Sequence, residues 1–252
     1  MKRRKFVTAS LTAGSLPFGI AAQANVRKQA QKEWYELRTY EIRFGGNQSQ
    51  LLDYLNQALK PAVTRAGANR FMLFRELGQS EPTKVWLWVS YPDIGSYQSA
   101  QDLSGDKDFQ LAAEFYNNLS VDQTIYNRYG SWLLNAFDGL PQAIDPVEDA
   151  SLFELRTYEG YSEDAVRRKI KMFNVEELEL FYKVKLNPLF FGEMIAGPYR
   201  PCLTYMINFK DMASHDASWK AFLEHPEWIK MRDKAEYANS VSNIRKTFLE
   251  PV

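Results

Sequence analysis

Two copies of a Glu-X-Arg-X-Tyr pattern are the groups of this chain best suited to chemistry. They are Glu36, Arg38 and Tyr40, and Glu154, Arg156 and Tyr158. Successive members of each trio lie two positions apart, so on a β-strand they share one face at spacings of about 6.5–7 Å. A guanidinium can hold a carboxylate or an enolate, and a phenol can transfer a proton. If this face lined an enclosed space, both copies would contribute such groups to a ligand pocket.

The same trios also have a structural interpretation. A buried charge without a partner is costly, so Glu and Arg on neighbouring strands are expected to neutralise each other and fix the register between sheets. Both copies keep all three residues, whereas an active site in a duplicated protein often degenerates in one copy. This symmetric retention favours architecture over catalysis.

Two tryptophans and one histidine complete the set of candidates. Trp86 and Trp88 share a strand face whose counterparts in the second copy are Thr204 and Met206, so the two copies would line a pocket differently. Large aromatic residues pack in cores more often than they stack on ligands, but an apolar pocket would need them. His215 is a weak candidate for a catalytic acid or base, and a surface or capping histidine is the favoured interpretation.

An internal repeat places these residues on equivalent elements. The segment Tyr35–Glu41 (YELRTYE) recurs 118 residues later as Phe153–Glu159 (FELRTYE), and the same offset aligns Val89–Asp93 with Ile207–Asp211. Such matched spacing over the intervening chain indicates two copies of one unit.

The repeat predicts the domain organisation. We expect units at residues 35–137 and 152–251, joined by a linker at 138–151 with two prolines. Each unit has the order strand, helix, strand, strand, helix, strand of a ferredoxin-like βαββαβ domain, an α+β class whose antiparallel sheet carries helices on one face. The bare faces of two such sheets can pack together and enclose a barrel.

Alternation and turn residues predict the remaining elements. Besides the repeated first strand, we expect strands at Phe71–Leu77, Val85–Tyr91, Leu189–Ile195 and Leu203–Phe209, with closing strands near Tyr129–Asn135 and Val241–Leu249. Asp93, Asp211 and Ser162 are the expected helix caps, and Pro61 is expected to bend the first helix.

Several of these motifs together resemble those of a known family. They are Tyr35–Tyr40, Phe153–Tyr158, the Gly after the second strand, and the stretch from Asn208 through Trp219 to His225-Pro-Glu-Trp228. This set is similar to the NIPSNAP domain, and the likeness is best in the second copy. The resemblance implies two tandem ferredoxin-like repeats packed as a dimeric α/β-barrel type fold. It implies little about activity, because most bacterial members have no known reaction.

The N-terminal segment has the order of an export signal. Residues 1–24 begin with Lys2, Arg3, Arg4 and Lys5, continue through a mildly apolar stretch and end in small residues. The run Arg-Arg-Lys-Phe-Val resembles the twin-arginine signal of bacteria. We expect a periplasmic or otherwise exported protein without stable membrane insertion after signal removal. A membrane anchor is disfavoured because Gly and Pro break the short apolar stretch, and a transit peptide because its basic residues would be spread out.

Composition and missing motifs narrow the partners and reactions. The formal net charge is zero, with 31 Lys+Arg and 31 Asp+Glu, so no basic field favours binding to nucleic acid. Cys202 is the single cysteine, so no disulfide is expected. No metal site is expected either, because His215 and His225 are ten residues apart, Pro226 interrupts the helix, and Cys202 lies on a different strand. The motifs GxGxxG, Walker A, GxSxG, HExxH and CxxC are absent, and no cofactor is expected.

Two functions of different classes fit this sequence. The favoured one is a binding or interaction module, whose barrel encloses a small apolar or carboxylate-bearing ligand or whose outer faces assemble into a homo-oligomer. The alternative is a cofactor-independent enzyme, similar to monooxygenases and isomerases of this barrel fold, that acts in the barrel cavity. The sequence does not decide between binding and catalysis.

Overall fold

The expected order of strands and helices occurs twice along the chain. The computed structural model describes residues 31–78 and 80–252, so the export signal expected at residues 1–24 lies outside the described residues. The first half contains β1 (Trp34–Ile42), α1 (Gln48–Asp53), η1 (Tyr54–Leu59), α2 (Lys60–Arg65), β2 (Arg70–Glu76), β3 (Lys84–Tyr91), α3 (Ile94–Gln101), α4 (Lys107–Ala112), α5 (Glu114–Asn117), η2 (Val121–Gln123) and β4 (Tyr126–Ala136). The second half contains β5 (Leu152–Glu159), α6 (Glu163–Met172), η3 (Phe173–Glu177), α7 (Leu178–Lys183), β6 (Pro188–Ala196), β7 (Cys202–Phe209), α8 (Met212–Glu224), α9 (Pro226–Arg232), η4 (Ala235–Tyr237) and β8 (Asn243–Pro251).

Short polar side chains begin the helices at the expected positions. Asp93 accepts a hydrogen bond from the backbone N–H of Ser96, and Asp211 accepts one from Ser214, each at 2.8 Å. The first helix of each half also contains a π-helical turn, η1 or η3. Only the first of these turns is followed by a proline, Pro61. The irregularity therefore belongs to the fold and is not caused by that proline.

Eight strands close into one barrel that the two halves share. The strand order around the ring is β1-β3-β2-β8-β5-β7-β6-β4, so the halves meet at the pairs β2–β8 and β4–β6. The register is short at both seams, running from Phe74 to Glu76 on β2 and from Leu133 to Ala136 on β4. The prediction that two ferredoxin-like sheets pack together and enclose a barrel is confirmed.

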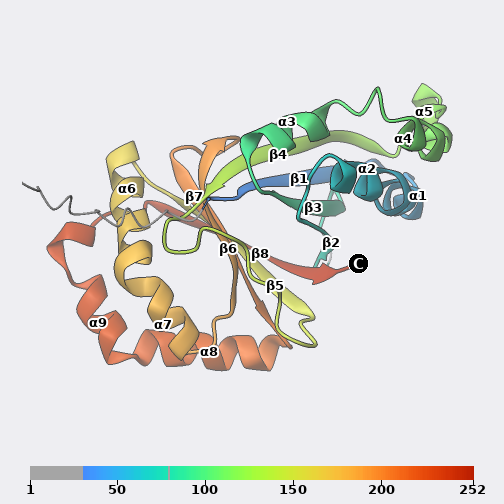
Figure 1. Cartoon of the computed structure of the whole chain (residues 1–252). Coiled ribbons are helices and arrows are strands. Elements are labelled where there is room, and N and C mark those ends of the chain that lie inside the picture. Colours follow the sequence, from blue (N-terminus) through green and yellow to red (C-terminus); the bar gives the residue numbers. More distant parts are fainter. Residues whose placement is uncertain (1–30, 79) are drawn as a thin grey trace, which may run out of the picture.

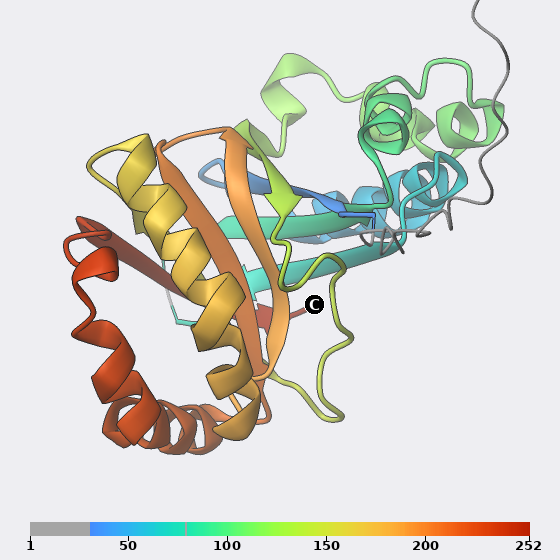
Figure 2. The ribbon, with the colours of Figure 1, turned by 60° about the vertical axis from the view of Figure 1, so that its left-hand side comes forward.

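Helices cover the barrel on two opposite sides. In Figure 1 the helices of the first half lie at the right and top, those of the second half lie at the left and bottom, and the strands run between them. The turned view in Figure 2 shows α6 to α9 on one side of the strands and the first-half helices on the other. Among the described residues, no helix has the length and apolar character needed to cross a membrane.

Aromatic side chains from both halves fill the centre of the barrel. Trp88 of the first half stacks on Phe190 of the second, with ring centroids 5.3 Å apart and planes at 14°. Phe74 also meets Phe153 across the halves, but edge to face, at 4.9 Å and 61°. All four side chains are almost completely buried. Such close packing leaves the barrel centre occupied by protein.

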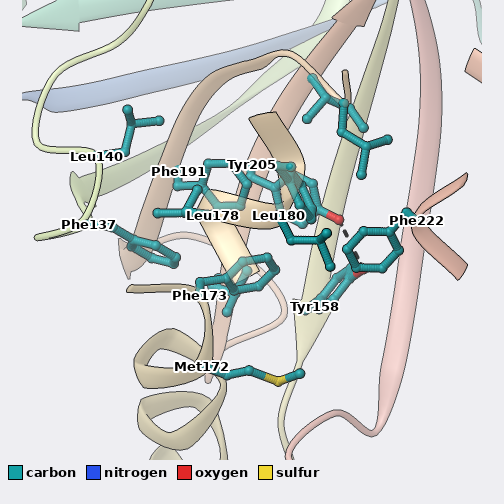
Figure 3. Packing of buried hydrophobic residues seen from close by; sticks show 14 of the residues in the cluster. Phe137, Leu140, Tyr158, Met172, Phe173, Leu178, Leu180, Phe191, Tyr205 and Phe222 are labelled. Atoms are coloured by element: carbon teal, nitrogen blue, oxygen red, sulfur yellow. Dashed lines mark hydrogen bonds between the residues drawn. The ribbon is translucent and has the colours of Figure 1, made fainter. Parts of the chain in front are cut away.

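A second layer of apolar residues lies between each sheet and its own helices. Figure 3 shows this layer in the second half, where Phe191 and Tyr205 of the sheet face Phe173 of η3 and Phe222 of α8. Phe191 and Tyr205 stack at 4.4 Å, and the Tyr205 hydroxyl donates to the hydroxyl of Tyr158 at 3.0 Å. Tyr158 therefore points toward the helices and away from the barrel centre.

Candidate functional site

The Glu-Arg-Tyr trios lie beneath the helices and not inside the barrel. On β1, Leu37 joins the interior cluster, whereas Tyr40 packs in the layer under the first-half helices. On β5, Leu155 is interior and Tyr158 is under the helices. The pocket interpretation of these trios required the opposite orientation. The physical reason is that the face where the two sheets meet has to be apolar, and the leucines of this alternating strand supply it.

In the first half, hydrogen bonds from five side-chain atoms surround the carboxylate of Glu36. Arg38 donates from Nε at 2.6 Å and from Nη2 at 3.0 Å. Tyr91, Gln101 and Ser131 donate at 3.1, 3.3 and 3.1 Å. Burial, together with this carboxylate, raises the pKa of the Tyr91 phenol well above its usual value. The structural interpretation expected this ion pair to join neighbouring strands. It forms instead between two residues of the same strand, β1.

In the second half, Glu154 has the same ion pair but different neutral donors. Arg156 Nη1 donates to it at 2.6 Å and Trp219 Nε1 at 2.7 Å, and His215 Nε2 lies 3.2 Å away. The other ring nitrogen of His215 lies 2.8 Å from Asp216 Oδ1. Each ring nitrogen of His215 thus contacts a carboxylate, and the side chain links α8 to β5. The favoured interpretation of a surface or capping histidine does not describe this position. As an acid or base, His215 would first have to release one of these partners.

A second buried ion pair in this half was missed by the sequence analysis. Lys169 Nζ lies 2.6 Å from Glu177 Oε2, and both residues are buried. Burial raises the pKa of Glu177, and the neighbouring Lys169 opposes that shift. At the repeat offset the first half has Leu51 and Leu59, which are also buried. The signal available in the sequence was this replacement of two apolar residues by opposite charges.

The opening at one end of the barrel is the candidate functional site. A cavity of about 590 Å³ lies there, within the range of small-molecule pockets. Residues of both halves line it, including Thr39, Trp86, Gly130, Trp132, Thr157 and Tyr199. We call this cavity the barrel mouth. Two residues deeper along β1, Leu37 pairs with Trp88, where the filled interior begins.

Trp86 and Trp132 form the apolar floor of the barrel mouth. Their rings meet edge to face at 5.5 Å and 85°. The Trp86 indole N–H donates to Glu76 at 3.0 Å, and the ring of Tyr199 stands 6.3 Å from that of Trp132. Of the two tryptophans nominated from the sequence, Trp86 therefore borders the cavity, whereas Trp88 is packed in the core.

Cations outnumber acids around the barrel mouth. The cations are Lys84, Arg128, Arg245 and Lys246, and the acids are Glu41 and Glu76. Lys84 pairs with Glu76 at 3.7 Å, and Arg245 pairs with Glu159. Arg128 forms no ion pair within the described part of the chain, and its Nη1 donates to the carbonyl of Asn127 at 2.6 Å. The mouth therefore favours an anionic ligand.

Nucleophilic and metal chemistry have little support in this part of the chain. Cys202 is buried, and burial raises the pKa of its thiol to about 11, so it is not a thiolate at neutral pH. Within residues 31–78 and 80–252, no three His, Cys, Asp or Glu side chains lie close enough together to hold a metal ion.

Comparisons with known proteins identify the fold and one domain. A family model described as NIPSNAP matches residues 153–252. A candidate monooxygenase from Lactobacillus acidophilus NCFM has a TM-score of 0.57 at 11% identity, covering 87% of this chain and 94% of that chain. A candidate monooxygenase from Fusobacterium nucleatum subsp. nucleatum ATCC 25586 has a TM-score of 0.58 at 9% identity, covering 87% and 92%. No curated protein matched. At these identities the structural likeness shows the fold alone.

The buried ion pair of the first half can be tested by replacing its cation. Arg38→Met leaves Glu36 buried without its cation, so the free energy of unfolding should fall by about 3–5 kcal/mol in chemical denaturation. Arg167→Met is the matched control, because this guanidinium is exposed and pairs with Asp164 on the surface of α6. The control should cost less than about 1 kcal/mol. Equally small losses in both variants would show that the buried pair has no structural role.

Proposed function

We propose that this chain, whose residues 153–252 form a NIPSNAP domain, binds a small molecule at the mouth of its barrel. The observation that carries the proposal is the cavity of about 590 Å³ over the Trp86–Trp132 floor. The filled interior below this floor leaves the ligand outside the barrel centre. This is the binding function expected from the sequence, moved from the enclosed space to its opening.

The chemistry of the mouth suits an apolar ligand that carries a carboxylate. The indole ring of Trp132 provides flat apolar surface, on which aromatic groups pack edge to face or with an offset. The ring of Tyr199 lies beside it and already carries the Arg245 guanidinium 3.8 Å from its centroid. The surplus of cations around the rim attracts an anionic group and stabilises it by charge-assisted hydrogen bonds. A ligand with a ring at one end and an acid at the other would use both features.

A cofactor-independent reaction is the alternative function. The fold that the chain shares with candidate monooxygenases supports it by analogy alone. The trios that could have held an enolate or moved a proton lie under the helices, where each carboxylate is already bound by its own arginine; among the described atoms of these trios, Arg156 Nε alone is buried without a partner. A reaction would therefore have to use the groups of the barrel mouth, among which Glu76 and Lys84 are the titratable pair nearest the floor. Binding is the better-supported function.

We also propose that the chain is exported, since its first residues have the order of a twin-arginine signal. An exported binding protein would meet its ligand outside the cytoplasm.

Ligand retention tests the binding function. We expect mass spectrometry of the protein purified from its native cells to find a small acidic molecule, and Trp132→Ala to retain about tenfold less because the cavity loses part of its floor. Trp34→Ala is the control, because Trp34 packs under the first-half helices. A compound kept equally by Trp132→Ala, or no compound on any form of the protein, would contradict the proposal.

Export is tested by the double substitution Arg3→Lys and Arg4→Lys. It keeps the positive charge of the segment but removes the arginine pair, so we expect the protein to accumulate in the cytoplasmic fraction on cell fractionation. Lys2→Arg should leave export unchanged. Normal export of the double variant would rule out the twin-arginine route.

A further inference from the structure

We infer that Thr39, Gly130 and Trp132 form a binding site for one oxygen of an anionic group on the ligand. We call this site the glycine notch. The inference rests on the proposed binding at the barrel mouth and adds where the acidic end of the ligand binds. The ligand class is a flat apolar molecule with a carboxylate or a similar oxyanion.

The missing side chain of Gly130 leaves the space for this oxygen. Gly130 stands opposite Thr39 in the β1–β4 register. A Cβ atom built on Gly130 would lie 3.2 Å from Thr39 Oγ1 and 3.8 Å from Trp132 Nε1. The hydroxyl and the indole N–H thus border the same small space beside Gly130, and a ligand oxygen lying farther from the Gly130 Cα, between the two groups, would accept from both.

Both of these polar groups lack a partner within the protein. Across residues 31–78 and 80–252, neither Thr39 Oγ1 nor Trp132 Nε1 takes part in a hydrogen bond. Trp132 as a whole residue is 9% exposed, and its indole N–H is not sealed in the protein but borders the open space of the barrel mouth. The indole N–H of the neighbouring Trp86 donates to Glu76, whereas that of Trp88 is buried in the core without a partner among the described residues. An acceptor supplied by a ligand would complete the arrangement at Trp132.

The equivalent position in the second half is filled. Thr157 corresponds to Thr39, and its hydroxyl shares a hydrogen bond with Thr204 at 2.9 Å. Arg245 stands opposite Thr157 on β8, where the first half has Gly130. In the second half, therefore, the position that corresponds to the notch is occupied by a side chain, and the threonine hydroxyl there already has a hydrogen-bond partner. The open notch is a feature of the first half and not a consequence of the fold.

The charges around the notch select an acceptor with negative charge. Arg128, two residues before Gly130 on β4, lines the mouth and has no carboxylate partner within the described residues. An indole N–H only donates, so the group that binds there has to accept. Glu76 is held by Trp86 and Lys84, on the other side of the floor. A ligand carboxylate would therefore be attracted to the notch, where it has two hydrogen-bond donors and the Arg128 cation. It would be repelled by the carboxylate of Glu76 on the other side.

A pair of probes tests the notch on the full chain. The probes are 2-naphthoate and the neutral 2-naphthylmethanol, which share the ring system and differ in the charged group. We expect the protein to bind 2-naphthoate about tenfold more tightly in isothermal titration calorimetry. The indole N–H resonance that disappears in Trp132→Phe should also move when 2-naphthoate is added.

Two variants then test whether the preference for 2-naphthoate over 2-naphthylmethanol arises at the glycine notch. Gly130→Ala fills the notch, and Thr39→Val removes the hydroxyl while keeping the branched shape. Each should weaken 2-naphthoate binding by about tenfold and change 2-naphthylmethanol binding by less than about twofold. The backbone of Gly130 does not have the positive φ that would strain an alanine, and Thr39→Val decides the matter if Gly130→Ala fails to fold. Gly105→Ala is the matched control, since its Cβ would meet nothing within 4 Å.

The possible failures separate the two proposals. If the protein binds both probes equally, or if Gly130→Ala and Thr39→Val bind 2-naphthoate as the unchanged protein does, the notch is wrong and binding at the mouth stands. If the unchanged protein binds neither probe, the notch and the proposed function are both overturned.

Discussion

Aromatic packing across the two halves inside the barrel is the interaction on which the rest of this structure depends. The β-ladders that join the halves are short, and the longer ladders all lie within one half. The seams therefore contribute fewer backbone hydrogen bonds than the ladders within each half. Contacts such as Trp88 on Phe190 provide the shared buried surface that makes one barrel of two ferredoxin-like sheets.

This packing also decides where the polar groups go. Since the inner faces have to be apolar, the Glu-Arg pairs of β1 and β5 lie on the outer faces, under the helices. A buried carboxylate then needs donors from the covering helix. Gln101 of α3 serves Glu36, whereas Trp219 and His215 of α8 serve Glu154. The donors have diverged while the Glu-Arg ion pair has stayed, as expected if the requirement is to satisfy a buried carboxylate.

The repeat and the alternation of the strands were sufficient to predict the order of the elements and the closed barrel. They also showed that Glu36, Arg38 and Tyr40 share a face, but not which face. Both faces of β1 are buried, one in the barrel and one under the helices, so the usual contrast between an apolar and a solvated side is missing. Tyr40 packs under the helices as readily as Leu37 packs inside.

The candidate site could be predicted only in part. Trp86 and Trp88 were recognised as sharing a face, but their depth depends on where the barrel ends, and that follows from the stagger of strands distant in sequence. Gly130 carries no signal of its own, because its meaning depends on Thr39 across the strand pair and Trp132 beside it. The buried Lys169–Glu177 pair was visible in principle, as charges at positions that are apolar in the other copy.

A double-mutant cycle between Trp88 and Phe190 tests the central claim most directly. The free energies of unfolding would be measured for Trp88→Leu, Phe190→Leu and the double variant. If the halves are held by this interior packing, the two residues should show a coupling energy of about 0.5–1.5 kcal/mol. Strictly additive losses would mean that the two rings do not meet, and the shared filled interior would have to be given up.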